Sequence, residues 1–343
     1  MKLHIKRVDV ERMLILCSAA LVVALALRGQ QEAGVRYEEP VSQVTVASDT
    51  TDKANQTSVV VFYQDGEGYL VPVTTTVNTT SGVAKAALSL LVQSGANDLA
   101  AARMGLKTTI PEGTQIDLDI SSGKARVDLK GAAAKLTSAE AESVLVSSVA
   151  QTLCGFDTVD EVSFLFDGQK RSKLTFGTQV SAAFSGGLVN LESMETMASA
   201  GDTLNTVQLY FPSSSGRMLV PVTRTVYSDP DVTTAMIELA KGPRDDSGLE
   251  APLPKSCAVK GVTMKNGVVT INFSKEFMEA MEKDSSLQTL RSVMFTAAQF
   301  PGVKQVRIQV EGKDYTPPDT AQTTFINQES DIVTYYPGVI EVD

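Results

Sequence analysis

The chain contains one module twice, and this internal repeat constrains its fold more strongly than any other feature of the sequence. The segment Leu70-Val71-Pro72-Val73-Thr74 returns as Leu219-Val220-Pro221-Val222-Thr223. Further apolar positions align between the copies: Val127 with Ile271, Leu129 with Phe273, Val162 with Val306 and Phe164 with Ile308. A repeat of this length, well over about a hundred residues, is too long for a solenoid unit. We therefore interpret the chain as a duplicated domain.

Composition narrows the classes of function. The chain has 343 residues and a net charge of −10, and this length is sufficient for two domains with buried cores. The acidic balance argues against nucleic-acid binding, because phosphates are bound by clustered Lys and Arg. The single histidine, His4, precedes the repeats, which excludes a His-based triad or a His-ligated metal site within them. We expect no cofactor and no metal.

The cysteines give a weaker signal. Cys154 and Cys257 do not align between the copies, and no pair of cysteines has zinc-site spacing. We interpret both as buried, unreactive thiols. A disulfide that joins the two repeats is the alternative, and it would suit an oxidising compartment.

An unbroken apolar run, Met13 to Leu27, follows basic residues near the N-terminus. Its length suits a signal h-region and is short for a spanning helix, which needs about 20 residues. Three interpretations remain open: a signal-anchor, a signal peptide cleaved at Ala24-Leu25-Ala26, and a lipoprotein attached through Cys17, although Leu16 precedes that cysteine where a small residue is usual. Each predicts that the chain after Arg28 is exported, since positive charge stays inside.

The periodicity of apolar residues predicts the same order of elements in each copy. A β-hairpin is followed by a helix, two strands, a second helix and a final strand. In the second copy Asp229 is the expected N-cap of the first helix, and Lys241-Gly242-Pro243 ends that helix. The first copy has a longer loop there, which runs through Met104. We predict an α+β fold: two tandem copies of a small sheet-plus-two-helices domain, each a β-hairpin and then αββαβ, with a mixed or antiparallel sheet.

The predicted divisions of the chain follow from these patterns. Polar residues without apolar periodicity form the linkers, and the repeats form the domains. The divisions are a targeting segment 1–28, a flexible linker 29–57, a first domain 58–192, an inter-domain linker 193–204, a second domain 205–328 and an acidic tail 329–343.

The second strand of each hairpin is a candidate interaction edge. Pro72 and Pro221 cannot donate to a β-ladder, so these strands are expected at an edge or a bulge. An edge strand can pair with a strand of another chain. The candidate interaction residues are Leu70, Pro72, Thr74, Leu219, Pro221 and Thr223.

Acidic residues are the remaining candidates for chemistry. Asp117, Asp119 and Asp128 lie on adjacent predicted strands, but the aligned residues of the second copy are not acidic, so we interpret the cluster as a solvated face. Asp65 and Glu67 are expected to be turn residues. A hydrolase would need a carboxylate pair in one cleft, for which the candidates by type are Glu140, Glu142 and Glu161. We therefore expect no catalytic residues.

The tail contains the string Tyr335-Tyr336-Pro337. It is either an exposed recognition element or part of a strand that completes the second domain.

Five strings of the second copy carry a further signal: Tyr210-Phe211, Leu219-Val220-Pro221-Val222-Thr223-Arg224, Lys241-Gly242-Pro243, Phe273-Ser274-Lys275-Glu276-Phe277 and Phe300-Pro301-Gly302-Val303. Together they resemble the GerMN domain of the GerM family of sporulation and spore germination proteins. The resemblance extends over both copies, about residues 58–192 and 205–328.

The resemblance implies an exported, membrane-associated, non-enzymatic protein that acts between mother cell and forespore and helps to assemble a transenvelope complex. It also implies a core similar to the ring-building motif of stacked-ring secretion machines. The expected partners are proteins of a sporulation envelope complex and further copies of the chain, as a ring or oligomer, with the N-terminal segment in the membrane. The alternatives are a peptidoglycan- or small-ligand-binding envelope protein and, third, a germination hydrolase. The absence of Trp argues against a glycan site, because such sites usually present exposed aromatics.

Overall fold

The computed structural model describes residues 56–79, 82–192 and 204–316, and these described residues of both repeats belong to one compact unit. The elements of the first repeat are β1 Gln56–Gln64, β2 Leu70–Asn78, α2 Val83–Leu90, α3 Gly95–Arg103, β3 Thr114–Ser121, β4 Gly123–Gly131, the 3-10 helix η3 Ala132–Lys135, α4 Ala139–Cys154 and β5 Val159–Phe166. Those of the second are β6 Asn205–Pro212, β7 Leu219–Val226, α5 Val232–Lys241, β8 Val259–Lys265, β9 Val268–Phe273, α6 Phe277–Met281, α7 Ser286–Ala298, β10 Gln305–Val310 and β11 Lys313–Asp314.

Each repeat has the predicted α+β composition and element order, and the αββαβ part forms a mixed sheet. β3 pairs with β4 in antiparallel fashion, and β4 pairs with β5 in parallel. β8, β9 and β10 repeat this arrangement, and β11 is added beyond β10. The parallel step requires a crossover between the paired strands, and the long helix of each repeat, α4 or α7, makes that crossover.

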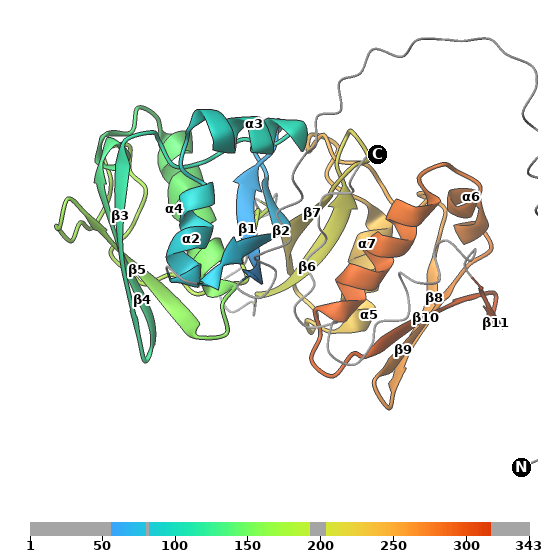
Figure 1. The fold of residues 1–343 in the computed structure, drawn as a ribbon. Helices are drawn as coiled ribbons and strands as arrows, with labels where there is room; N and C mark the ends of the chain where they lie inside the picture. Colours follow the sequence, from blue (N-terminus) through green and yellow to red (C-terminus); the bar gives the residue numbers. More distant parts are fainter. Residues whose placement is uncertain (1–55, 80–81, 193–203, 317–343) are drawn as a thin grey trace, which may run out of the picture. The chain divides into compact units, whose positions relative to one another are not determined.

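The hairpins form sheets of their own, separate from the mixed sheets. In the first repeat α2 and α4 contact the hairpin on one side, and α4 contacts β5 of the mixed sheet as well (Figure 1). In the second repeat α5 and α7 contact β6, and they also contact β8 and β10 respectively. In each repeat the helices therefore pack against two sheets, the hairpin and the mixed sheet. The sequence predicted a single sheet per repeat.

Alternating side chains place the core where the sequence predicts it. Val127, Leu129 and Phe164 of the first mixed sheet are buried, as are Ile271 and Phe273 of the second. Burial of each such side chain contributes roughly 1.5–3 kcal/mol. The core is thus built from the same aligned positions in both repeats.

The tight turns between adjacent antiparallel strands need left-handed backbone. Asn266-Gly267 has φ values of 53° and 80°, and Ser122-Gly123 has 51° and 78°. Two successive positive φ values define a type I′ turn, whose twist matches that of the strands it joins. Asn-Gly is a residue pair that favours this turn type.

Two local predictions were wrong. The N-cap of α5 is Asp231 rather than Asp229, because the Asp231 side chain accepts a hydrogen bond from the Thr234 amide at 2.7 Å. The longer loop of the first copy contains helix α3, which Ser94 caps through the Asn97 amide. This helix buries little more than Ala101, so it lacks the apolar stripe from which a helix is recognised.

A buried threonine on the long helix of each repeat binds the backbone of the hairpin. Thr152 Oγ1 accepts a hydrogen bond from the Phe62 amide at 3.0 Å, and Thr296 Oγ1 accepts one from the Tyr210 amide at 3.1 Å. Both threonines are fully buried. A buried amide without an acceptor is costly, so these hydroxyls take the place of a neighbouring strand. Their matched positions on the long helices are a signal that the sequence interpretation missed.

Candidate functional site at the junction between the repeats

The predicted interaction residues lie on the outer edges of the two hairpins. β2 and β7 each pair on one side with the other strand of their hairpin, and Pro72 and Pro221 oppose Phe62 and Tyr210 there. Five of the six predicted residues are buried, and Thr74 is half-buried. Among the described strands, β2 and β7 each pair with one strand only, and whether a partner binds these residues stays a prediction.

Asn190 binds both edges at once. Its side-chain Oδ1 accepts a hydrogen bond from the Leu70 amide at 2.9 Å, while Nδ2 donates to the carbonyls of Leu70 and Pro221, each at 2.8 Å. The amide side chain thereby pairs with β2 as a strand residue would, and it bonds to β7 on the other side. Asn190 has a φ of 50°, a left-handed conformation that Asn tolerates better than most residues.

The residues around Asn190 add a short parallel segment to β7. Leu191 forms a parallel bridge with Thr223. The Thr223 amide donates to the Val189 carbonyl at 3.0 Å, and the Glu192 amide donates to the Thr223 carbonyl at 2.9 Å. The side chain of Val189 is buried with Phe62 and Leu70. The first repeat thus ends on the edge strand of the second.

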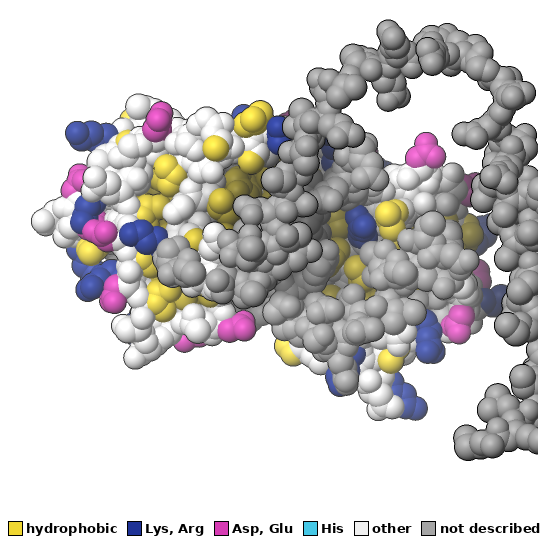
Figure 2. Space-filling view, in the orientation of Figure 1, with side chains coloured by type: hydrophobic (Ala, Val, Ile, Leu, Met, Phe, Trp, Pro, Cys, Tyr) yellow, Lys and Arg dark blue, Asp and Glu magenta, His cyan; other side chains and the backbone are white. Residues whose placement is uncertain are grey.

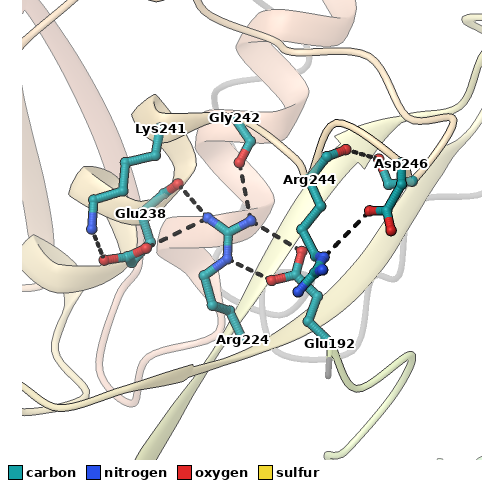
Figure 3. A network of polar contacts seen from close by, with 8 residues as sticks. Glu192, Arg224, Glu238, Lys241, Gly242, Arg244 and Asp246 are labelled. Atoms are coloured by element: carbon teal, nitrogen blue, oxygen red, sulfur yellow. Dashed lines mark hydrogen bonds and ion pairs between the residues drawn. The ribbon is translucent and has the colours of Figure 1, made fainter. Parts of the chain in front are cut away.

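Arg224 fixes this segment electrostatically (Figure 3). Its guanidinium forms a two-point contact with Glu192, at 2.7 Å through Nε and 3.0 Å through Nη2, and donates to the carbonyls of Glu238 and Gly242. The side chains of Arg224, Glu192 and Glu238 are 13–14% exposed, and the guanidinium lies 5.7 Å from the ring centroid of Phe211. Burial would lower the pKa of Arg224, but the hydrogen bonds and charges of Glu192 and Glu238 outweigh it and raise the pKa above its usual value. Bidentate, charge-assisted contacts of this kind are among the stronger hydrogen bonds in proteins.

A second contact between the repeats lies beside this one. The Tyr69 hydroxyl, at the start of the first hairpin's second strand, donates to the Ser247 carbonyl at 3.0 Å. A side chain added at Gly248 would lie 3.3 Å from Glu67 Oε2. We call the set Leu70, Asn190, Glu192, Pro221 and Arg224 the junction. Its hydrogen bonds use the backbone groups of Leu70 on one edge and Pro221 on the other, so the two edges are joined at these residues, and the use of either edge by a partner stays a prediction.

Leu70 and Pro221 were among the candidate interaction residues, whereas Asn190, Glu192 and Arg224 were not recognised from the sequence. Glu192 was the last residue of the predicted first domain, and the aligned position to Arg224 in the first repeat is Thr75. Contacts that occur once in a duplicated chain leave no matched pattern. A lone Arg and Glu thirty-two positions apart give no local signal.

The aspartates of the first mixed sheet are paired or hydrogen-bonded. Lys130 bonds to Asp117, and its hydrogen bond is the largest cause that lowers the pKa of that carboxyl. Arg126 pairs with Asp119 at 3.4 Å. Asp128 accepts from the Gly168 amide at 3.0 Å, and the aligned Asn272 accepts from Gly312 at 2.9 Å. Asp128 and Asn272 therefore share a structural task, and the described residues include no cluster of metal-ligating side chains.

The glutamates considered for hydrolysis are not in one cleft. Glu142 is 2% exposed, and its carboxylate accepts from the amides of Phe176 and Thr178. Glu161 pairs with Lys124 at 2.7 Å on the exposed sheet face, and Glu140 accepts from the Gln64 side chain. Asp65 is a turn residue as expected, since its Oδ1 accepts from the Glu67 and Tyr69 amides. None of these carboxylates is placed to work with another.

The two described cysteines are free thiols. Cys257 is buried, and burial raises its pKa to about 11. Cys154 is half-buried, and burial again raises its pKa. The inter-repeat disulfide considered from the sequence does not form here, because each thiol is enclosed in its own repeat.

The candidate targeting segment, including Cys17, and the acidic tail lie outside the described residues. Within residues 56–79, 82–192 and 204–316, no helix has both the length and the apolar character needed to cross a bilayer.

Comparisons with known proteins identify the module. The Germane family model, described as "Sporulation and spore germination", matches residues 60–172 and 208–316, both within the predicted domains. The spore germination protein GerM of Bacillus subtilis (strain 168) is 30% identical over 296 residues, which are 82% of this chain and 80% of that protein. The solved structure of the tandem GerMN domains of the sporulation protein GerM from Bacillus subtilis is similar in fold, with a TM-score of 0.63 and 24% identity over 80% of this chain and 100% of that one. The chain therefore belongs to the GerM family of sporulation and spore germination proteins and contains two tandem GerMN domains.

Proposed function

We propose that this protein is a non-enzymatic scaffold that helps to assemble an extracytoplasmic protein complex during sporulation, in the space between mother cell and forespore. Membership of the GerM family supports a role in sporulation. The apolar N-terminal run preceded by basic residues supports a membrane-tethered, exported chain. The scaffold role itself rests on the geometry of the junction.

One observation carries the proposal. Asn190, Glu192 and Arg224 join the two repeats through partly buried polar contacts. Such contacts hold the surfaces of both modules in a fixed relation. A chain that presents two related surfaces at a fixed spacing gains affinity for an assembly because the second binding event becomes intramolecular.

The contacts of four carboxylates support the proposal that the protein is not an enzyme. Glu142 and Asp128 bind backbone amides, and Asp117 and Glu161 bind lysines on a wet sheet face. Each of these groups already has a structural partner. We therefore assign the protein to assembly rather than to hydrolysis.

The test is affinity capture of the tagged full-length chain from crosslinked sporulating cells, with mass spectrometry of what is recovered. We expect other exported sporulation proteins in a constant ratio to the bait. A double junction variant, Asn190→Gly with Arg224→Met, should recover them in reduced ratio while its circular dichroism stays that of a folded protein. Lys255→Ala is the matched control, because this side chain is 88% exposed and outside the junction.

Two results would contradict the proposal. Equal recovery by the junction variant would show that fixed spacing of the modules is not needed. Recovery of cell-wall fragments without proteins, together with co-sedimentation of the purified chain with peptidoglycan, would favour the glycan-binding alternative.

A further inference from the structure

The first strand of each mixed sheet has an open edge in the described part of the chain. β3 and β8 are the first strands of the two mixed sheets, and each pairs on one side only, with β4 and β9. Between Gln115 and Ser121, and along β8, the described residues make no further backbone hydrogen bonds. The junction occupies Leu70 of β2 and residues 221–223 of β7, whereas an additional strand could pair along the whole of β3 or β8.

The edge of β8 is incompletely covered on its apolar side. Met264 and Val262 oppose the buried residues Val269 and Ile271 and so belong to the inward row of the sheet. Met264 is nevertheless 48% exposed, and Val262 is half-buried. One more strand beside β8 would cover both side chains.

The two open edges differ in charge. β3 presents Asp117 and Asp119, both exposed, whereas β8 presents Lys260 and Lys265, also exposed. Lys260 bonds to the exposed Glu311, and Lys265 forms no ion pair among the described residues. Figure 2 shows Lys and Arg side chains around the turn between β8 and β9. An acidic strand would therefore be attracted to β8 and repelled by β3.

The chain has one segment that fits the β8 edge. Residues 329–343 contain Glu329, Asp331, Glu341 and Asp343 and no Lys, Arg or His. Within this segment Asp331 to Tyr336 is rich in the β-branched and aromatic residues that favour strands. The segment follows β11, which is separated from β8 by three strand spacings of about 4.8 Å, or roughly 14 Å. Residues 317–328, when extended, can span roughly 40 Å, so the tail can reach the far edge of its own sheet.

We propose that the acidic C-terminal tail, residues 329–343, adds a strand to the open edge of β8 in its own chain. The carboxylates lie near Lys260 and Lys265, and apolar side chains of the tail cover Val262 and Met264. The second mixed sheet is then closed at both ends, because β11 already lies beside β10.

Hydrogen exchange of the full-length chain, read by mass spectrometry over residues 259–265, tests the proposal. The matched internal control is the β3 edge, residues 114–121. We expect the outward amides of β8 to exchange at least about tenfold more slowly than those of β3. A stop after Gln328 should remove this protection and leave β3 unchanged.

An exchange of charges between β8 and the tail distinguishes a loss of strand pairing from a loss of stability of the domain. Lys265→Glu should weaken the protection of β8 in the full chain, and Asp331→Lys combined with Lys265→Glu should restore part of it. Equal exchange of β8 with and without the tail would overturn the proposal, as would a failure of the charge exchange to restore protection. Protection that disappears on dilution would also overturn it, because the tail would then bind a second copy instead.

Discussion

Buried hydroxyl groups distinguish the two repeats at the scale of single residues. Ser148 on α4 and Ser292 on α7 are aligned, and both are fully buried. Ser148 Oγ donates to Thr109 Oγ1 at 2.7 Å. In the second repeat Pro252 replaces Thr109, and Ser292 Oγ has no hydrogen-bond partner among the described residues. Divergence of one residue has therefore left a polar atom without its partner.

The serine pair should respond to alanine in opposite directions. Ser148→Ala leaves Thr109 without its hydrogen bond and should lower the free energy of unfolding by about 1 kcal/mol. Ser292→Ala removes a buried, unpaired hydroxyl and should be neutral or stabilising by up to about 1 kcal/mol. Equilibrium unfolding in urea measures both. Equal losses in the two variants would mean that Ser292 has a partner after all.

At the scale of elements, the contact between the long helix and the hairpin is what makes each repeat one body. The helix packs its apolar side chains on the hairpin, and one threonine on it satisfies a strand amide that no other strand reaches. Gln299 adds a second such bond in the second repeat, where its side chain accepts from the Gln208 amide at 3.0 Å. The hairpin is therefore joined to the αββαβ unit by side-chain hydrogen bonds as well as by apolar contact.

Substitutions of Thr152 can distinguish the contribution of side-chain shape to stability from that of the hydrogen bond. Thr152→Val keeps the size of the side chain but leaves the Phe62 amide buried without an acceptor, which should cost roughly 1–3 kcal/mol of unfolding free energy. Thr152→Ser keeps the hydroxyl and should cost less than Val. Thr296→Val and Thr296→Ser are the matched pair in the second repeat. If valine is tolerated better than serine, packing rather than the hydrogen bond decides this contact.

At the scale of the whole molecule, the junction couples two domains that the sequence presents as separate. Its contacts are polar and partly buried. A fully buried ion pair that loses one partner costs about 3–5 kcal/mol, and the pair of Glu192 and Arg224, whose side chains are 14% and 13% exposed, should cost less. Asn190 bonds to both repeats. The two domains should therefore unfold together.

Calorimetry can measure this coupling. The intact chain should unfold in one cooperative transition. Asn190→Gly tolerates the positive φ of this position and removes three hydrogen bonds. Combined with Arg224→Met, it should split the transition into two. A single transition in the double variant would show that apolar contacts between the repeats are sufficient for coupling.

The periodicity of apolar residues predicted the structure correctly where buried positions recur along a strand or helix. Alternation in β3, β4 and their counterparts predicted the strands and the inward residues, and Asn266-Gly267 predicted the turn that joins β8 to β9. Helix α3 was missed because it buries almost nothing, and Asp229 was preferred as a cap because Pro230 follows it. For the cap, the residue that the local sequence favours lies two residues before Asp231, whose side chain forms the capping hydrogen bond.

By itself, the amino-acid sequence determined the duplication, the order of elements, the edge position of Pro72 and Pro221 and the family resemblance. These depend on side chains that recur at regular spacing or at matched places in the two copies. The tertiary structure decided how the edges are used, because Asn190, Glu192 and Arg224 occur once each and meet only when distant segments fold together. A contact made by single residues far apart in the chain has no period, and its energy arises only from the burial that the fold creates.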